Sequence, residues 1–377
     1  MHLQIQKFIK DNTDSLYSIL KALCLIPAPS GSEEKRAAYC LNWLKDNGAE
    51  NAYIDDALNV VFPWCIEESK DITVFAAHTD TVFPDTAPMP YEEKDGKVFC
   101  PGVGDDTAHV AILLLTAKFF VQNNIRPQNG FLFVFNSCEE GLGNLKGVRK
   151  LMEQYSGRIS RFVTYDALLG VLHDECVGSH RYKVEVTTRG GHSFQDFGVP
   201  NAIAELSKMI SKIYQITPPK DRDSRTTYNV GIISGGTSVN TISQSASMLC
   251  EYRSDSYLCL ETMKREFERI FAEGNREGVH VQVKQIGDRP CANIDASLQK
   301  AFCDRCANVV SNVLGKDVLF KSASTDCNIP LSLGIPSVCI GLYEGGGAHT
   351  REEWLVKDSL LKGLEVALQV GMDLLIK

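Results

Sequence analysis

The sequence lacks any apolar run long enough to cross a membrane. Its longest candidate, VAILLLTAKFFV at residues 110–121, contains Lys118, whereas a membrane-spanning helix needs about 20 consecutive apolar residues. Residues 1–23 have the pattern of an amphipathic helix and lack the apolar core of a secretion signal. From these absences we expect a cytoplasmic protein that does not bind a membrane.

A surplus of positive charge is also missing. The chain has 39 Lys and Arg against 47 Asp and Glu, a formal net charge of −8, and nucleic-acid phosphates need a basic surface. Glycine-rich phosphate loops are missing too, since no G-x-G-x-x-G or Walker sequence follows a predicted strand. We therefore expect no nucleic-acid partner and disfavour a nicotinamide-dependent or phosphate-binding enzyme.

Cysteine is abundant, but its pattern does not favour disulfides. The chain has 13 cysteines, an odd number, at irregular spacing, and without an export signal we expect free buried thiols in a reducing cytosol. The single C-x-x-C motif, Cys303 to Cys306, lacks a second pair that would complete a zinc site. We interpret it as one turn of a surface helix.

The first part of the chain alternates helices with apolar strands. We predict strands at 72–77, 131–136 and 161–166, with a helix at 106–122 among them. Continuous apolar strands separated by helices indicate a mostly parallel sheet that is covered on both faces. A chain of 377 residues is also long for one hydrophobic core, which favours two domains.

The second part of the chain has a different pattern. From about residue 180 the expected order is strand, helix, strand, strand, helix, strand, with alternating apolar and polar residues in the strands. This order is typical of a small sheet with helices on one face. After Pro290 the first pattern resumes. We therefore predict a discontinuous α/β domain at 1–179 and 289–377, with an inserted α+β domain at 180–288.

Acidic and histidine residues follow several of the predicted strands. His78 and Asp80 end the strand at 72–77, and residues i and i+2 of a strand point to the same side. The other such residues are Asp105, Asp106, Glu139, Glu140, Asp166 and His349. Ligands of open α/β sheets bind beyond the carboxyl ends of the strands, so we expect these side chains to converge. Two histidines and several carboxylates suit a divalent ion, with zinc as the leading candidate.

The order of these motifs resembles the M20 family of co-catalytic metallopeptidases and deacylases. The resemblance covers essentially the whole chain and rests on HTD, GVGDD, SCEEG, YDA and GGGAH, in that order, and on the stretch STDCNIPLSLGIPSVCIG. It implies that the large domain is a zinc-peptidase-like catalytic domain and that the inserted domain is a ferredoxin-like lid that makes a homodimer. It also implies two divalent metal ions per chain, most often zinc, with cobalt or manganese as alternatives.

Carried onto this sequence, the resemblance assigns the metal ligands. Asp105 would bridge the two ions. His78 and Asp166 would complete one site, and Glu140 and His349 would complete the other.

The resemblance also assigns three residues to catalysis. Asp80 would not bind metal but would fix the tautomer and orientation of His78. Glu139 would be the general base that takes the proton of the attacking water. His192, in RGGHSFQDFG, would stabilise the tetrahedral oxyanion across a dimer interface. In addition, the peptide bond between Asp105 and Asp106 would be cis.

Two residues of the inserted domain would bind substrate. Asn240, in GGTSVNTI, and Arg253, in EYRSD, would reach a carboxylate or the backbone of the substrate, as the resemblance implies. Structural roles stay open, because His192 could be a turn residue and Arg253 a charge at a strand end.

Two further histidine segments have structural and functional interpretations. The family commonly has Lys-Gly after the two aspartates, whereas Thr107, Ala108 and His109 stand here. His109 lies one helical turn from Asp105 and could touch the site, although we favour a packed helix histidine. The segment HDECVGSH at 173–180 lies where the chain enters the inserted domain, and we interpret it as a hinge.

Three functions are open at this point. The first is a dinuclear-metal amidohydrolase that cleaves short peptides, the second a deacylase of N-acyl amino acids, and the third a binding protein without catalysis. The third is disfavoured because every expected ligand and the base are present. In the family, the ligand at the position of Asp166 tends to be Asp in aminopeptidases and dipeptidases, so we predict an aminopeptidase of di- and tripeptides. Asn240 and Arg253 would serve a deacylase equally well.

Overall fold

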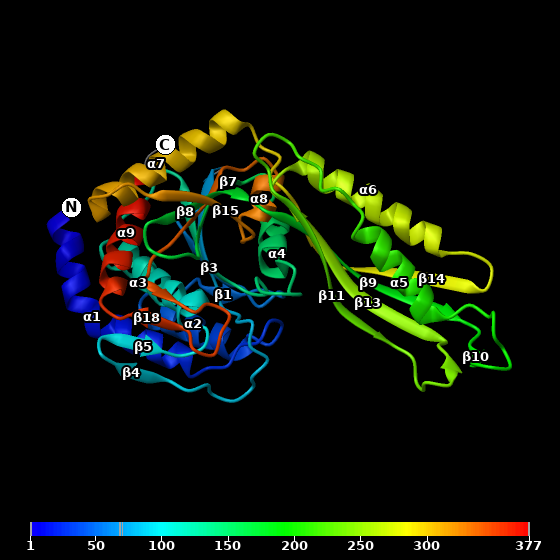
Figure 1. The fold of residues 1–377 in the computed structure, drawn as a ribbon. Coiled ribbons are helices and arrows are strands. Elements are labelled where there is room, and N and C mark those ends of the chain that lie inside the picture. Colours follow the sequence, from blue (N-terminus) through cyan, green and yellow to red (C-terminus); the bar gives the residue numbers. More distant parts are fainter. Residues whose placement is uncertain (1, 68, 70, 376–377) are drawn as a thin grey trace. The chain divides into compact units, whose positions relative to one another are not determined.

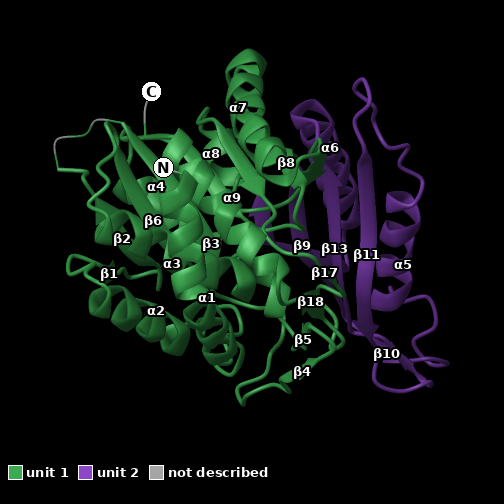
Figure 2. Cartoon of the chain, turned by 90° about the vertical axis from the view of Figure 1, so that its left-hand side faces the viewer, with its two compact units in different colours: residues 1–176, 293–377 green, residues 177–292 purple. Residues whose placement is uncertain are grey.

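The computed structural model describes residues 2–67, 69 and 71–375. The chain forms two compact units, unit 1 at Met1–Cys176 with Asn293–Lys377 and unit 2 at Val177–Ala292 (Figure 2). Each unit has its own hydrophobic core. The chain enters unit 2 within the segment that the sequence predicts as a hinge.

The central sheet of unit 1 has eight strands: β1 (Tyr53–Ile54), β2 (Val60–Trp64), β3 (Ile72–His78), β6 (Gly130–Asn136), β7 (Ile159–Tyr165), β8 (Val171–Cys176), β15 (Leu319–Ala323) and β16 (Ser337–Ile340). Their order is β1-β2-β6-β3-β7-β16-β8-β15. The pairs β3–β6, β3–β7, β7–β16 and β8–β15 are parallel, and the other three pairs are antiparallel. The predicted α/β fold with a mostly parallel sheet is confirmed.

The helices of unit 1 are α1 (His2–Cys24), α2 (Glu34–Asp46), α3 (His109–Gln122), α4 (Lys146–Gln154), α7 (Ala296–Leu314), α8 (Asn328–Ser332) and α9 (Ser359–Asp373). Helix α3 is apolar on nearly all sides because it lies among α1, α2 and α9 and also packs on β3 and β6 (Figure 1). It therefore forms the centre of the core of unit 1.

Helix α3 begins later than the sequence predicts. The predicted helix starts at residue 106, but the segment η1 (Val103–Ala108) is an irregular turn with non-helical angles at Asp105 and Asp106. The physical reason is that this turn is held by a distant side chain rather than by its own helical hydrogen bonds, as described below for the site.

A second, small sheet in unit 1 joins two segments that are far apart in sequence. It consists of β4 (Glu92–Lys94), β5 (Lys97–Phe99), β17 (Gly345–Gly346) and β18 (Trp354–Val356), in the order β17-β18-β5-β4. These strands have only two or three residues, too few for a readable alternation, and the sequence analysis did not predict them. Pairing of β18 with β5 brings the segment before η1 next to the segment that carries His349.

Unit 2 has the element order that the alternation predicts. Its elements are β9 (Gly178–Thr188), α5 (Ala202–Ile213), β11 (Thr226–Gly235), β13 (Ser245–Ser254), α6 (Tyr257–Gly274) and β14 (Val279–Arg289). The strands form an antiparallel sheet in the order β11-β13-β9-β14. Tyr182, Val184 and Val186 of β9 point to one face of the sheet. Helices α5 and α6 cover that face (Figure 1). A short ladder joins β10 (Gly191–His192) to β12 (Thr241–Ile242).

The structure bears on two expectations from the sequence, the lack of a membrane-spanning helix and the state of the cysteines. Within the part of the chain that the structure describes, no helix combines the length and apolar character needed to span a bilayer. None of the thirteen cysteines forms a disulfide, as expected. The C-x-x-C motif is one turn of α7, but Cys303 and Cys306 are only 2% and 1% exposed. They face the core because they share a helical face with Phe302 and Val310.

Candidate active site

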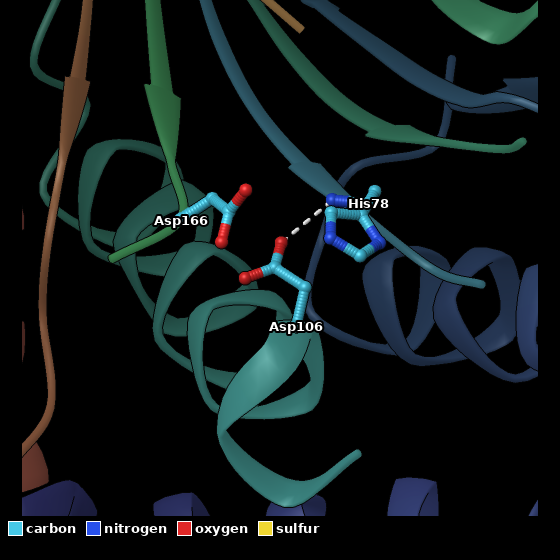
Figure 3. A group of neighbouring side chains, drawn as sticks. All are labelled: His78, Asp106 and Asp166. Carbon is cyan, nitrogen blue, oxygen red and sulfur yellow. Dashed lines mark hydrogen bonds between the residues drawn. The ribbon is translucent and has the colours of Figure 1, made fainter. Parts of the chain in front are cut away.

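The ends of three adjacent parallel strands create the site. Strand β3 lies between β6 and β7, with His78 opposite Asn136 and Ala76 opposite Thr164. The segments that follow these strands therefore leave the sheet at the same edge. His78, Asp106 and Asp166 meet there, with ligand atoms within 4.8 Å of one another (Figure 3).

The Asp105 carboxylate lies between the two histidines. Its Oδ1 is 3.1 Å from Nε2 of His78, and its Oδ2 is 3.0 Å from Nε2 of His349. Nε2 of His349 is also 3.1 Å from Oε1 of Glu140. His78, Asp105 and Glu140 form a second group with ligand atoms within 4.8 Å. One carboxylate thus presents one oxygen to His78 and the other to His349.

Asp106 lies closer to the site than the sequence analysis implied. Its Oδ2 accepts a 2.7 Å hydrogen bond from the backbone amide of His78, and its carboxylate joins the group of His78 and Asp166. The peptide bond between Asp105 and Asp106 is cis, the arrangement that the resemblance implies. Asp106 is therefore an additional candidate ligand.

Asp80 organises the turn that carries the two adjacent glutamates. Its carboxylate accepts hydrogen bonds of 2.9 Å from the amides of Glu139 and Glu140, and of 2.6 Å from the hydroxyl of Ser30. Oδ1 of Asp80 is 3.4 Å from Nδ1 of His78. Burial alone would raise the pKa of Asp80, but His78, Ser30 and the Glu140 amide stabilise the charged form, and the pKa is lowered. A charged Asp80 thus fixes the backbone of Glu139 and the ring of His78.

Negative charge is in excess across the site. Burial, and then the charge of Asp105, raise the pKa of Asp166 well above its ordinary value. Burial likewise raises the pKa of Asp106 well above its ordinary value. Hydrogen bonds to Asp105 and Glu140 raise the pKa of His349 to about 11. Crowded carboxylates with two imidazoles among them are a donor set that divalent cations fit, because a cation offsets the repulsion between the negative charges.

Glu353 is a site residue that the sequence analysis missed. Glu353 is 1% exposed, and its carboxylate accepts hydrogen bonds from the amides of Gly102 (2.6 Å), Gly104 (2.8 Å) and Asp105 (2.9 Å). Gly104 must be glycine, because a Cβ there would lie 2.3 Å from a ring carbon of Tyr343. Glu353 thus fixes the turn that aims Asp105.

Glu33, like Glu353, accepts backbone hydrogen bonds and fixes a turn of the site. Oε1 of Glu33 accepts hydrogen bonds from the amides of Gly31 (2.8 Å) and Cys138 (3.0 Å). Cys138 has a left-handed backbone, φ 57°, directly before Glu139. Such a conformation costs about 1–3 kcal/mol for a residue other than glycine, so Glu33 stabilises the turn that presents Glu139. A lone glutamate before a helix gives no sequence signal for this contact.

His109 is a packed helix histidine. It is fully buried, its Nδ1 contacts the Asp106 carboxylate, and its Nε2 accepts a 3.2 Å hydrogen bond from the amide of Leu342. The ring lies edge-on to Tyr343. Burial lowers the pKa of His109 to about 3, so the ring is neutral. Both interpretations from the sequence describe part of this geometry, since the ring is packed in the core and also contacts Asp106 of the site.

The predicted substrate and oxyanion residues of unit 2 lie at two different ends of its sheet. His192 pairs with Thr241, and the Ser193 amide donates a 3.0 Å hydrogen bond to the carbonyl of Asn240. His192 and Asn240 are therefore neighbours. Arg253 lies at the other end of β13, opposite Ser179.

Comparisons with known proteins give the family. The profile of peptidase family M20/M25/M40 matches residues 74–373. The chain is 22% identical to succinyl-diaminopimelate desuccinylase from Corynebacterium glutamicum over 339 residues, 87% of this chain and 88% of the relative. It shares a fold with aminopeptidase PepT from Bacillus cereus, with a TM-score of 0.74 and 19% identity over 96% of this chain and 99% of PepT. A dinuclear metal-binding M20 peptidase from Bacillus subtilis has a TM-score of 0.64 and 18% identity over 96% of this chain and 99% of that one.

The family match agrees with the fold and with the motifs that carry the resemblance. The matched segment begins within β3 and ends within α9, so it contains every predicted metal ligand. At under 25% identity the structural neighbours show the fold alone. This protein therefore belongs to peptidase family M20/M25/M40 and is a hydrolase of the metallopeptidase and amidohydrolase class.

Proposed function

We propose that the protein is a dinuclear-metal amidohydrolase that removes the amino-terminal residue of di- and tripeptides. The observation that carries the proposal is the position of Asp105, whose two oxygens each lie within about 3 Å of a different histidine. A carboxylate that faces two ligand groups suits two cations that share it.

The proposed metal ligands combine members of these two groups with His349, which contacts Asp105 and Glu140. His78 and Asp166 would hold one ion, His349 and Glu140 would hold the other, and Asp105 would touch both. When bound, a pair of divalent cations polarises the amide carbonyl and acidifies a water molecule. The nitrogen and oxygen donors favour zinc, with cobalt or manganese as alternatives.

Glu139 would move the proton. Within the described residues its carboxylate belongs to neither candidate ligand group, and its backbone is fixed by Asp80. As general base it takes a proton from the attacking water. It then gives that proton to the amide nitrogen, and the carbon–nitrogen bond breaks to release a free amine.

Glu353 should support metal binding without being a ligand. Glu353→Ala leaves three buried amides without an acceptor, so we expect about 10- to 100-fold weaker metal binding, the usual effect of losing a group that orients ligands. A competition titration with a chromogenic chelator measures this. Glu352→Ala, at the exposed neighbour, is the matched control. Equal metal affinity in the two variants would contradict this role for Glu353.

Two kinds of substrate are compatible with this chemistry. The shared fold with aminopeptidase PepT and the short Asp166 ligand support the peptidase. The relative named succinyl-diaminopimelate desuccinylase supports the second candidate, a deacylase of N-acyl amino acids. We favour the peptidase because a carboxylate that is one methylene shorter leaves room beside its ion for the amino end of a substrate.

A matched pair of substrates separates these functions. We expect dialanine, with a free amine, to be hydrolysed at least about tenfold faster than N-acetyl-dialanine, because a site built for an amine rejects an analogue that cannot form its hydrogen bonds. Alanine and acetate release are measured separately. Faster cleavage of the acetylated compound, with acetate as product, would identify a deacylase instead.

The lid residues support a homodimer as the working enzyme. In the β13–β9 ladder, Ser245 is opposite Thr187 and Arg253 is opposite Ser179, so the two ends are about 26 Å apart at roughly 3.3 Å per residue. An extended tripeptide spans only about 10 Å. His192 and Arg253 of one chain are therefore too far apart to contact the same small substrate, and we assign the oxyanion role to His192 of a second copy. The exposed edge strand β11, with Ile232 and Ile233 at 58% and 56% exposure, is a suitable contact for that copy.

Mixing two inactive variants tests this arrangement. His192→Ala should lower kcat about 100-fold without loss of metal, because an oxyanion donor is removed. A 1:1 mixture with Glu139→Gln, after subunit exchange, should recover about a quarter of the native activity, because half of the dimers then hold one intact site. Absence of recovery would place His192 in its own chain's site.

A further inference from the structure

His349 is the most exposed of the proposed metal ligands. Its side chain is 59% exposed, whereas those of His78 and Glu140 are 1% and 7% exposed. Its backbone is left-handed, with φ 65°, a conformation that is uncommon for residues other than glycine. Burial in the core therefore does not fix this ring, and its position depends on the contacts of the turn that carries it.

Arg351 joins the turn of His349 to the segment that follows β3. Its Nη2 donates a 2.7 Å hydrogen bond to Oδ2 of Asp85, and its Nη1 donates a 3.5 Å hydrogen bond to Sδ of Met89. Its guanidinium carbon lies 4.8 Å from the centre of the Phe83 ring. We call Arg351, Phe83, Asp85 and Met89 the arginine clasp.

The segment that Arg351 contacts is a firm attachment point within unit 1. Phe83 and Met89 are 6% and 4% exposed and belong to the hydrophobic core of that unit. Three prolines restrict the backbone of the segment: Pro84, Pro88 and Pro90. The segment begins directly after His78, the last residue of β3. The clasp thus ties the turn of His349 to the segment that follows another proposed metal ligand.

The contacts of the clasp act together on one planar group. The side chains of Arg351 and Asp85 are 51% and 32% exposed, and an exposed ion pair alone contributes little. The guanidinium group also lies over the buried Phe83 ring, which adds a cation–π contact, and its rigid fork fixes the direction of its hydrogen bonds. Contacts of this kind suffice to hold an exposed turn in one position.

We propose that Arg351 is a positioning residue for His349 and thereby sets the affinity for one of the two ions, the one that His349 and Glu140 would hold. This inference rests on the proposed dinuclear site. Arg351 would contact neither the ion nor the substrate, because its guanidinium group is engaged by Asp85 and Met89. It acts through the backbone of the turn that carries His349.

The other ion should not depend on the clasp. Its proposed ligands, His78 and Asp166, lie on other segments of the chain, and the shared ligand Asp105 is held by Glu353. Glu353 is near Arg351 in sequence, but it is fixed separately, since its backbone carbonyl accepts a 3.1 Å hydrogen bond from the amide of Cys100. Loss of the clasp should therefore affect the two ions unequally.

Stepwise zinc binding tests the proposal. Zinc is titrated into metal-free protein, and calorimetry resolves the two binding steps. Arg351→Met keeps the length of the side chain without its charge. We expect it to weaken one step about tenfold and to leave the other within about twofold, since loss of groups that orient ligands usually weakens metal binding about 10- to 100-fold. His349→Ala should weaken the same step.

Two further variants separate positioning from a general loss of stability. Arg351→Lys should recover part of the affinity, because lysine keeps the charge but not the planar fork. Asp85→Asn should weaken the same step as Arg351→Met, and the double variant should be little weaker than either single variant, because both changes break one contact.

Lys357→Met is the matched control. Lys357 also joins this part of the chain to an earlier segment, through an ion pair with Glu93, but it follows β18 and is not on the turn of His349. It should leave both binding steps within about twofold. Equal weakening of both steps by Arg351→Met, or weakening of neither, overturns the proposal. The same selective effect in Lys357→Met also overturns it.

Metal binding and hydrolysis together separate failure of this inference from failure of the proposed function. Two ions and the selective effect of Arg351→Met, without hydrolysis of dialanine or N-acetyl-dialanine, would overturn only the proposed reaction. Two ions and full hydrolysis, without that effect, would overturn only the inference. A single ion in the native protein would overturn the dinuclear site and the inference with it.

Discussion

Replacing Glu139 by glutamine is expected to reduce kcat by about 100- to 10,000-fold and to leave the metal content unchanged. Glutamine keeps the shape of the side chain but cannot take a proton from water, and loss of a general base has effects of this size. Because Asp80 holds the backbone of Glu139, the fold should tolerate the change. Steady-state kinetics with dialanine and elemental analysis of the same sample measure both quantities.

The adjacent glutamate provides the matched contrast. Glu140 is 3.1 Å from His349 and belongs to a candidate ligand group, so Glu140→Gln should lose metal as well as rate. If Glu139→Gln instead loses metal to the same extent, Glu139 is a ligand and the base is elsewhere in the site.

Asp105→Ala is expected to have the largest effect on metal binding of any single change. Asp105 contacts both histidines, so its removal should reduce the metal content from about two ions per chain to less than one and abolish measurable turnover. Elemental analysis after dialysis against a fixed zinc concentration measures the content.

The control for this variant is an aspartate far from the site. Asp95→Asn lies in the exposed turn between β4 and β5, where the backbone is left-handed at φ 51° and asparagine is well tolerated. It should keep native metal content and rate. A metal content of about two in Asp105→Ala would show that Asp105 does not bridge the ions.

The sheet and the convergence of the ligands could be predicted because both depend on local patterns. Three continuous apolar runs predict three buried strands, and the parallel order of β6, β3 and β7 brings His78 and Asp166 to one edge. At least one histidine or acidic residue at or after the end of each strand is visible in the sequence, and the parallel pairing of the strands brings these residues together.

Other parts of the site depend on contacts that no local pattern encodes. Glu353 binds amides about 250 positions earlier in the chain, and the strands that bring these segments together have only two or three residues. The same contact makes η1 irregular and delays the start of α3 to His109. The arginine clasp was also not predicted, because Arg351 and Asp85 are 266 positions apart in the chain.

The most direct test of the central claim is a metal titration of the protein after chelation. Activity toward dialanine should be absent in the metal-free protein, rise as zinc is added, and level off at about two equivalents per chain. Because Asp105 would contact both ions, we expect little activity below one equivalent. Full activity in protein that elemental analysis shows to be free of metal would contradict the account.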